Sequence, residues 1–212
     1  MTDPSIFVRG VVLGFTIAAA VGPISLLVIR RSLAEGRVYG LASGLGVATA
    51  DGTYGAIAAF GLTALTDLLV DWRIALGILG GSFLLVLAWR TATALPTDPA
   101  SDPVPAHSRR DLAAAFGSLY ALTLTNPLTI LSFAALFVGL GVTGSGAAGA
   151  ALLTLGVWVG SALWWVVLTT VVSSLRTRIT PGWLRRVNLV SGVIIGAFAL
   201  IALGTAVAAI AG

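Results

Sequence analysis

Cysteine and lysine are absent from the sequence, and histidine occurs once. Without cysteine the chain has no disulfide, no thiolate metal ligand and no thiol redox chemistry. The single histidine, His107, lies in a polar stretch between apolar segments, so no apolar segment contains a Ser–His catalytic pair. No cluster of histidine and carboxylate residues has the ligand count of a transition-metal site. We therefore expect neither an enzyme of these common classes nor a bound metal or cofactor.

Charged residues are also scarce, at 9% of the 212 residues, whereas 58% of the residues are hydrophobic. A soluble globular domain is roughly 45–50% apolar, which argues against a water-soluble fold for this chain. A helix needs about 20 apolar residues to cross the core of a lipid bilayer. The sequence therefore predicts an all-α integral membrane protein in which residues 1–212 form a single transmembrane domain.

Six apolar segments are predicted to be transmembrane helices. The stretch from Leu112 to Leu175 contains no charge and is too long for one crossing, and the glycine-rich segment Gly139–Gly149 divides it. The first segment continues past a signal-peptide-like run at Ala18–Ala20, so we expect it to be retained as a helix. The expected helices lie near Ile6–Ile29, Val38–Thr66, Ile74–Trp89, Ala114–Leu140, Ala147–Val172 and Val187–Ala211.

The distribution of arginine predicts the orientation in the membrane, because cytoplasmic loops contain the excess of positive residues. Ten of the 12 arginines follow the first, third and fifth predicted helices, and only Arg9 and Arg73 lie on the other side. We therefore expect both termini on the non-cytoplasmic side and a proline-rich cytoplasmic linker at residues 91–111. Because the arginines lie in short loops, they indicate topology, and we expect no nucleic-acid partner.

The two halves of the chain resemble each other weakly and in the same order. The first repeat is expected over residues 5–90 and the second over residues 112–212. Because each repeat holds three helices, the second is inverted relative to the first, as is typical of secondary transporters. The matching segments are 22–25 with 126–129, 45–47 with 155–157, and Gly77 and Gly81 with Gly192 and Gly196.

Proline occurs inside the first and fourth predicted helices, at Pro23 and Pro127. A proline within a helix removes one backbone hydrogen bond, and the start of the following half-helix offers partial positive charge to a carboxylate. In matched helices of two repeats such breaks mark a substrate site. The alternative is that each proline only kinks a packed helix. The candidate residues of the substrate and proton pathway at these breaks are Gly22, Pro23, Ser25, Asn126, Pro127 and Thr129.

Asp51 is the only ionisable side chain deep in any predicted span. At 1.5 Å per residue it lies about 20 Å from the start of its helix at Val38. Small residues at Gly44, Ala48 and Gly55 share its helix face, which turns Asp51 inward. An intramembrane carboxylate is costly and usually serves a substrate or proton pathway, although a purely structural hydrogen bond is the alternative. We add Asp51 to the candidate site and expect it to bind a proton or an ammonium group.

These motifs resemble those of the LysE/RhtB family of amino-acid exporters over nearly the whole chain. The segments with the strongest similarity are Gly22-Pro23, residues 31–37, Ala50-Asp51, Ala59-Phe60-Gly61-Leu62 and residues 122–133. Many relatives have Pro-Gly-Pro at the first motif, whereas this chain has Val21 before Gly22-Pro23, so a mechanism that needs two prolines there does not transfer. The resemblance implies a multi-pass protein of the bacterial cytoplasmic (inner) membrane.

The resemblance also implies a secondary transporter that exports amino acids or related small metabolites, driven by the proton gradient. Its partners would be the amino-acid substrate, protons and the bilayer. The alternative is a transporter of divalent cations or other small ions, as found in the same superfamily, although divalent cations usually need several oxygen ligands. A membrane enzyme or assembly factor is a third interpretation. Glycine-rich faces such as Gly77, Gly80 and Gly81 pack helices within or between protomers, and we expect a homodimer.

Overall fold

The structure, a computed structural model, describes residues 4–19, 22–59, 73–94, 106–126, 129, 133, 146–175, 178 and 180–211. Every regular element within these ranges is a helix, so the predicted all-α fold class is confirmed for this part of the chain. The helices are α1 (Pro4–Ala19), α2 (Pro23–Ala34), α3 (Arg37–Ala59), α5 (Arg73–Ala92), α6 (Arg109–Thr125), α8 (Gly146–Ser174) and α9 (Pro181–Ala211).

The first predicted helix, Ile6–Ile29, is interrupted at the position of its proline. Helix α1 ends at Ala19, α2 begins at Pro23, and the axes of the two helices differ by 78°. Proline is well suited to the first position of a helix, because its φ angle is already helical and the amide it lacks has no partner there. The helix break predicted at Gly22-Pro23 is therefore present, and it separates two helices rather than kinking one.

Two other helices begin before their predicted starts, because capping residues lie in the polar sequence upstream. Helix α6 begins at Arg109, where Ser108 and Asp111 form a reciprocal capping box. Helix α9 begins at Pro181, six residues before the predicted Val187, and the Thr180 hydroxyl accepts a hydrogen bond from the amide of Trp183 at 3.3 Å. Hydropathy locates the apolar part of a helix, whereas the caps determine where the helix begins.

The length and composition of the helices support several membrane crossings. Within the described residues, the segments Ala147–Ser174 and Pro181–Ala209 are each long and apolar enough to span a bilayer, and α1 and α2 together make a third candidate. The later part of the predicted helix Ala114–Leu140 lies mostly outside the described residues, as does the end of Val38–Thr66. The count of six crossings therefore stays a prediction.

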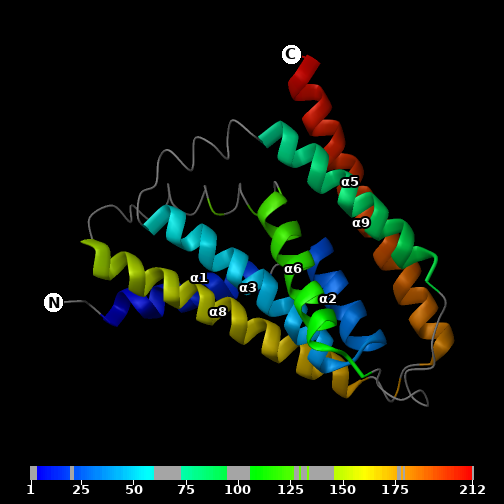
Figure 1. Ribbon diagram of the computed structural model, residues 1–212, viewed down its shortest axis with the longest axis horizontal. Helices are drawn as coiled ribbons and strands as arrows, with labels where there is room; N and C mark the ends of the chain where they lie inside the picture. Colours follow the sequence, from blue (N-terminus) through cyan, green and yellow to red (C-terminus); the bar gives the residue numbers. More distant parts are fainter. Residues whose placement is uncertain are drawn as a thin grey trace.

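The helices pack in pairs that join the two halves of the chain (Figure 1). Helix α1 lies along α8, α3 packs against both α8 and α6, and α5 lies along α9. Glycines allow the close approach: a Cβ atom added at Gly10 would lie 2.5 Å from the Leu153 carbonyl oxygen of α8. Gly77 and Gly81 of α5 face Ala206 and Leu203 of α9, so this glycine face packs within the chain. The homodimer expected from the sequence stays a prediction.

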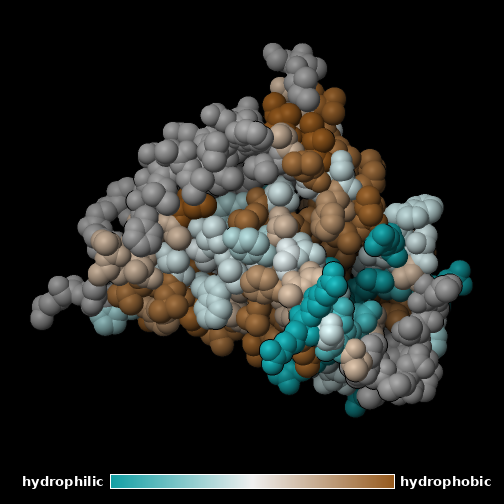
Figure 2. All heavy atoms as spheres, in the orientation of Figure 1, coloured by the Kyte–Doolittle hydropathy of each residue, from teal (hydrophilic) through white to brown (hydrophobic). Residues whose placement is uncertain are grey.

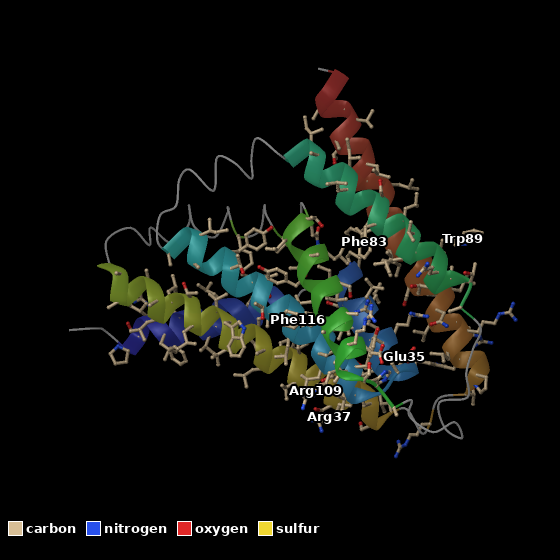
Figure 3. The ribbon with its side chains drawn as sticks, viewed as in Figure 1. Glu35, Arg37, Phe83, Trp89, Arg109 and Phe116 are labelled. Atoms are coloured by element: carbon tan, nitrogen blue, oxygen red, sulfur yellow. The ribbon has the colours of Figure 1, made fainter. Side chains whose placement is uncertain are left out.

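Polar and apolar surfaces are separated along the molecule. Figure 2 shows hydrophilic residues gathered at the end where α3 and α6 begin, and Figure 3 shows Glu35, Arg37 and Arg109 together at that end. We call it the arginine-rich end. Helix α5 presents large apolar side chains outward, including Phe83 and the 73%-exposed Trp89. An apolar outer surface of this kind is what a helix facing lipid requires.

Candidate functional site

A cavity of about 80 Å³ lies at the interruption between α1 and α2. Six of the seven predicted pathway residues line it: Gly22, Pro23, Ser25, Asp51, Asn126 and Thr129. The seventh, Pro127, lies outside the described residues. The remaining lining residues are Ile17, Ala18, Ile24, Val47, Thr123 and Trp165. The structure therefore brings together residues that lie more than 100 positions apart in the sequence.

Helix α2 contributes its N-terminus to the cavity. Gly22 is the N-cap in an extended conformation (φ −146°, ψ −174°), and it has no side chain with which to cap the helix. The Gly22 carbonyl accepts the first helical hydrogen bond, from the amide of Leu26 at 3.1 Å. A Cβ atom added at Gly22 would meet no heavy atom within 4 Å, so the space beside it is open. The positive end of the α2 dipole thus lies beside open space in the cavity.

Helix α6 contributes its C-terminus to the same cavity, through Thr123 and the C-cap residue Asn126. The amide of Asn126 donates to the Thr123 carbonyl at 3.2 Å, which closes the last turn. The Tyr54 hydroxyl of α3 donates to the carbonyl of Leu124 at 2.7 Å and holds this end in place. The C-terminal carbonyls of a helix have partial negative charge, so the cavity receives helix ends of opposite polarity.

Asp51 lies on α3 and is only 2% exposed, as the small-residue face predicted. Its Oδ2 atom accepts a hydrogen bond from the Ser161 hydroxyl of α8 at 2.7 Å. The indole Nε1 of Trp165, one turn further along α8, donates to the same Ser161 oxygen at 3.2 Å. Asp51 has no ion pair and no second hydrogen bond among the described residues, so its charge lacks a full set of partners.

Ser161 and the bond from Trp165 were not anticipated from the sequence, which favoured packing or an interfacial position for the tryptophans. The weak sequence match between the two halves contained the missing signal. Segments 45–47 and 155–157 match at an offset of 110, and the same offset places Ser161 opposite Asp51. The hydrogen-bonded partner of the buried carboxylate is therefore the residue that the expected repeat aligns with it.

A second polar cluster, at the arginine-rich end, was also not anticipated. The guanidinium of Arg31 donates to the Ser43 hydroxyl at 2.8 Å, to the Ala115 carbonyl at 3.1 Å and to the Ser118 hydroxyl at 3.0 Å. It also lies 5.7 Å from the centre of the Tyr39 ring. Arg31 therefore links α2, α3 and α6. From the sequence it was expected only in a cytoplasmic loop and in a segment of family similarity.

The chemistry open to the cavity follows from its lining. Asp51 is the only charged side chain among the described residues that line it, and the other polar side chains there are hydroxyl, amide and indole groups. Within the part of the chain that the structure describes, no group of three or more His, Asp or Glu residues is placed to hold a metal ion. The arrangement suits a small polar solute with one positively charged group, held without covalent chemistry.

The chain is similar to known membrane proteins. The family model of the LysE type translocators matches residues 15–205. The chain is also 32% identical over 183 residues to the uncharacterized membrane protein YahN of Escherichia coli (strain K12), across 82% of this chain and 78% of that relative. No solved structure matches the chain.

Proposed function

Because this chain belongs to the LysE type translocator family and is therefore a multi-pass membrane transporter of small molecules, we propose that it exports amino acids in exchange for protons. The cargo class extends to closely related zwitterionic metabolites. The observation that carries the proposal is the cavity at the helix break, where helix ends of opposite polarity and one buried carboxylate surround open space.

An amino-acid zwitterion matches this polarity. Its carboxylate would meet the N-terminal amides of α2 beside Gly22, where the helix dipole favours a negative charge. Its ammonium group would meet Asp51 and the C-terminal end of α6 at Asn126. An ammonium near Asp51 would give this buried carboxylate the charged partner that it lacks among the described residues.

Proton coupling is proposed for the same carboxylate. A buried acid that loses its ammonium partner is more easily protonated, because an unpaired charge in an apolar surrounding is costly. Release of substrate on one side would therefore favour uptake of a proton from that side. The proton would leave when the next ammonium group binds, which makes the two movements opposite in direction.

Alternating access would come from movement of two inverted repeats against each other. The helix pairs support such a relation: α1 packs on α8, while α6 and α3, their expected counterparts, also pack together. In the α5–α9 pair, Gly81 faces Leu203, and its expected counterpart Gly196 faces Ala88. Ala88 and Leu203 are separated by the same offset of 115 residues as the two glycines. With six crossings in the inner membrane, both termini would lie on the non-cytoplasmic side. The alternative cargo, a divalent cation, is disfavoured because it would find a single carboxylate in the cavity, whereas it usually needs several oxygen ligands.

The test is transport by purified protein in liposomes with an imposed proton gradient and a panel of labelled amino acids. We expect gradient-dependent flux of one class of amino acid, reduced at least tenfold by Asp51→Asn. Asp111→Asn is the matched control, because that carboxylate lies on the surface at the start of α6. Flux of metal ions in place of amino acids would reject the proposed cargo. Flux that persists in Asp51→Asn with unchanged pH dependence would remove Asp51 from the coupling.

A further inference from the structure

The buried hydrogen bonds around Asp51 have a fixed direction, which follows from the chemistry of each group. The indole nitrogen of Trp165 is a donor only, so the Ser161 oxygen accepts its hydrogen bond. The one hydroxyl proton of Ser161 is then free to point to Asp51, at 2.7 Å from Oδ2. Oδ2 is therefore an acceptor in this chain of bonds, and a proton on Oδ2 would have to displace the hydroxyl proton of Ser161 from the bond.

We propose that Ser161 and Trp165 are positioning residues that hold Asp51 through Oδ2 and leave Oδ1 as the one place for a proton or an ammonium group. The proposal rests on the exchange function described above and names the atoms that enforce it. Because a proton on Oδ1 removes the negative charge of the carboxylate, the ammonium group then loses its charged partner, and an ammonium group at Oδ1 in turn disfavours protonation. The coupling of one cargo molecule to one proton then follows from the hydrogen-bond network.

Burial supports the assignment, since the network is almost entirely enclosed by protein and meets open space at the cavity. Ser161 is fully buried and Trp165 is 1% exposed, yet Trp165 and Asp51 both line the cavity. A Cβ atom added at Gly44 would lie 2.6 Å from Cβ of Trp165, so α3 approaches α8 closely at this ring. The indole therefore has little freedom to turn away, and the orientation of the Ser161 hydroxyl is fixed from both sides.

Within the part of the chain that the structure describes, no other charged side chain competes for Asp51 from the helices packed around it. Helix α8 contains no acidic, basic or tyrosine residue, and Arg30 and Arg31 lie at the far end of α2 from the cavity. The remaining titratable neighbours are two phenols: Tyr54, which donates to Leu124 O, and Tyr120, which lies 3.5 Å from the Thr53 hydroxyl. Asp51 is therefore the only acidic or basic side chain among the described residues that line the cavity.

The test measures the protonated carboxyl directly and needs no knowledge of the cargo. A hydrophobic carbodiimide reacts with protonated buried carboxyls, and its addition to the full-length protein in detergent is followed by mass spectrometry as a function of pH. Asp51→Asn supplies the background. For the wild type we expect one sigmoid with a single midpoint pH. Ser161→Ala removes a hydrogen bond that favours the charged form, so its midpoint should rise by about one pH unit.

Three further variants separate positioning from general damage. Ser161→Thr retains the hydroxyl and should keep the wild-type midpoint, whereas Trp165→Phe removes the orienting donor and should raise the midpoint by less than Ser161→Ala does. Thr170→Val removes a hydroxyl that bonds only within α8, to the Val166 carbonyl, and should change nothing. A wild-type midpoint in Ser161→Ala would overturn the role of the network.

Exclusive occupation of Oδ1 is tested with methylammonium as the probe. We expect it to slow labelling of the wild type in a concentration-dependent way, and sodium at equal ionic strength to have no such effect. Labelling that is insensitive to methylammonium would overturn the exclusion of ammonium by proton. Both results are independent of amino-acid flux, so failure of the proposed transport function would be seen separately, in the liposomes.

Discussion

Arg31 and Asp51 are both charged residues within the helix bundle, and their surroundings differ in one respect that matters for function. Arg31 donates three hydrogen bonds, to acceptors on α3 and α6. Asp51 accepts one, from Ser161, and faces a cavity. A buried charge is tolerated when its hydrogen-bonding capacity is used within the protein, and an incompletely used charge requires a ligand, a proton or water.

The difference assigns separate tasks to the two regions. The contacts of Arg31 connect the first half of the chain with α6, so the arginine-rich end is held by bonds that persist without cargo. The contacts of Asp51 leave capacity unused at the level of the helix break. Stability should therefore depend on Arg31 and transport on Asp51. Measuring the stability and the transport of variants at both residues tests this division.

The largest expected effect is on stability at Arg31. Arg31→Met keeps the length of the side chain but leaves the Ala115 carbonyl and two serines without their charged partner. We expect it to lower the free energy of unfolding by about 3 kcal/mol. Asp51→Asn retains an acceptor for Ser161 and removes a buried charge, so it should not lower stability. Thermal unfolding of both variants in detergent measures this, and an Asp51→Asn protein less stable than Arg31→Met would contradict the division of tasks.

A smaller effect is expected when the partners of Arg31 are removed one at a time. Ser43→Ala and Ser118→Ala each delete one hydrogen bond to the guanidinium, and each should cost about 1.5 kcal/mol. Combined with Arg31→Met, either change should add little further loss, because the shared interaction is already gone. Ser174→Ala, whose hydroxyl bonds only to its own helix, is the control. Full additivity in the double variants would show that Arg31 does not use these serines.

The fold was largely predictable because the strongest signals are local. Each of the six predicted segments contains at least part of a described helix, and the break at Gly22-Pro23 follows from the restricted backbone of proline. The starts of α6 and α9 were placed too late, since the apolar pattern begins only after the capping residues.

The site was less predictable because its contacts depend on the relative register of distant helices. The residue types in the cavity could be found from the repeat, and Asp51 from its charge in an apolar segment. The bond to Ser161 requires that α3 and α8 pack at one particular height, which neither helix specifies alone. The partners of Arg31 similarly come from segments 12 to 87 residues away, so its role could not be deduced from a position in a loop.

Asp111 extends the comparison to a charged residue that is fully exposed and locally satisfied. Hydrogen bonds from Ser108 hold the pKa of Asp111 below its usual range. Because the folded pKa is lowered, the stabilisation is present above about pH 4, the usual aspartate value, and is lost as the pH falls through the folded pKa. Ser108→Ala should lower stability by about 1 kcal/mol at neutral pH. Unfolding midpoints measured from about pH 6 to pH 2 should then show a weaker acid-dependent decline than in the wild type.

The smallest effect on stability is expected at Gly22, an uncharged residue that lies beside open space. Its extended backbone suits any residue, and an added Cβ would meet nothing within 4 Å. Gly22→Ala should therefore change the free energy of unfolding by less than about 0.5 kcal/mol. Gly22→Leu should be nearly as stable but should fill the cavity and reduce transport far more. A Gly22→Leu protein with wild-type flux would show that the cargo does not pass beside the N-terminus of α2, whatever the role of Asp51.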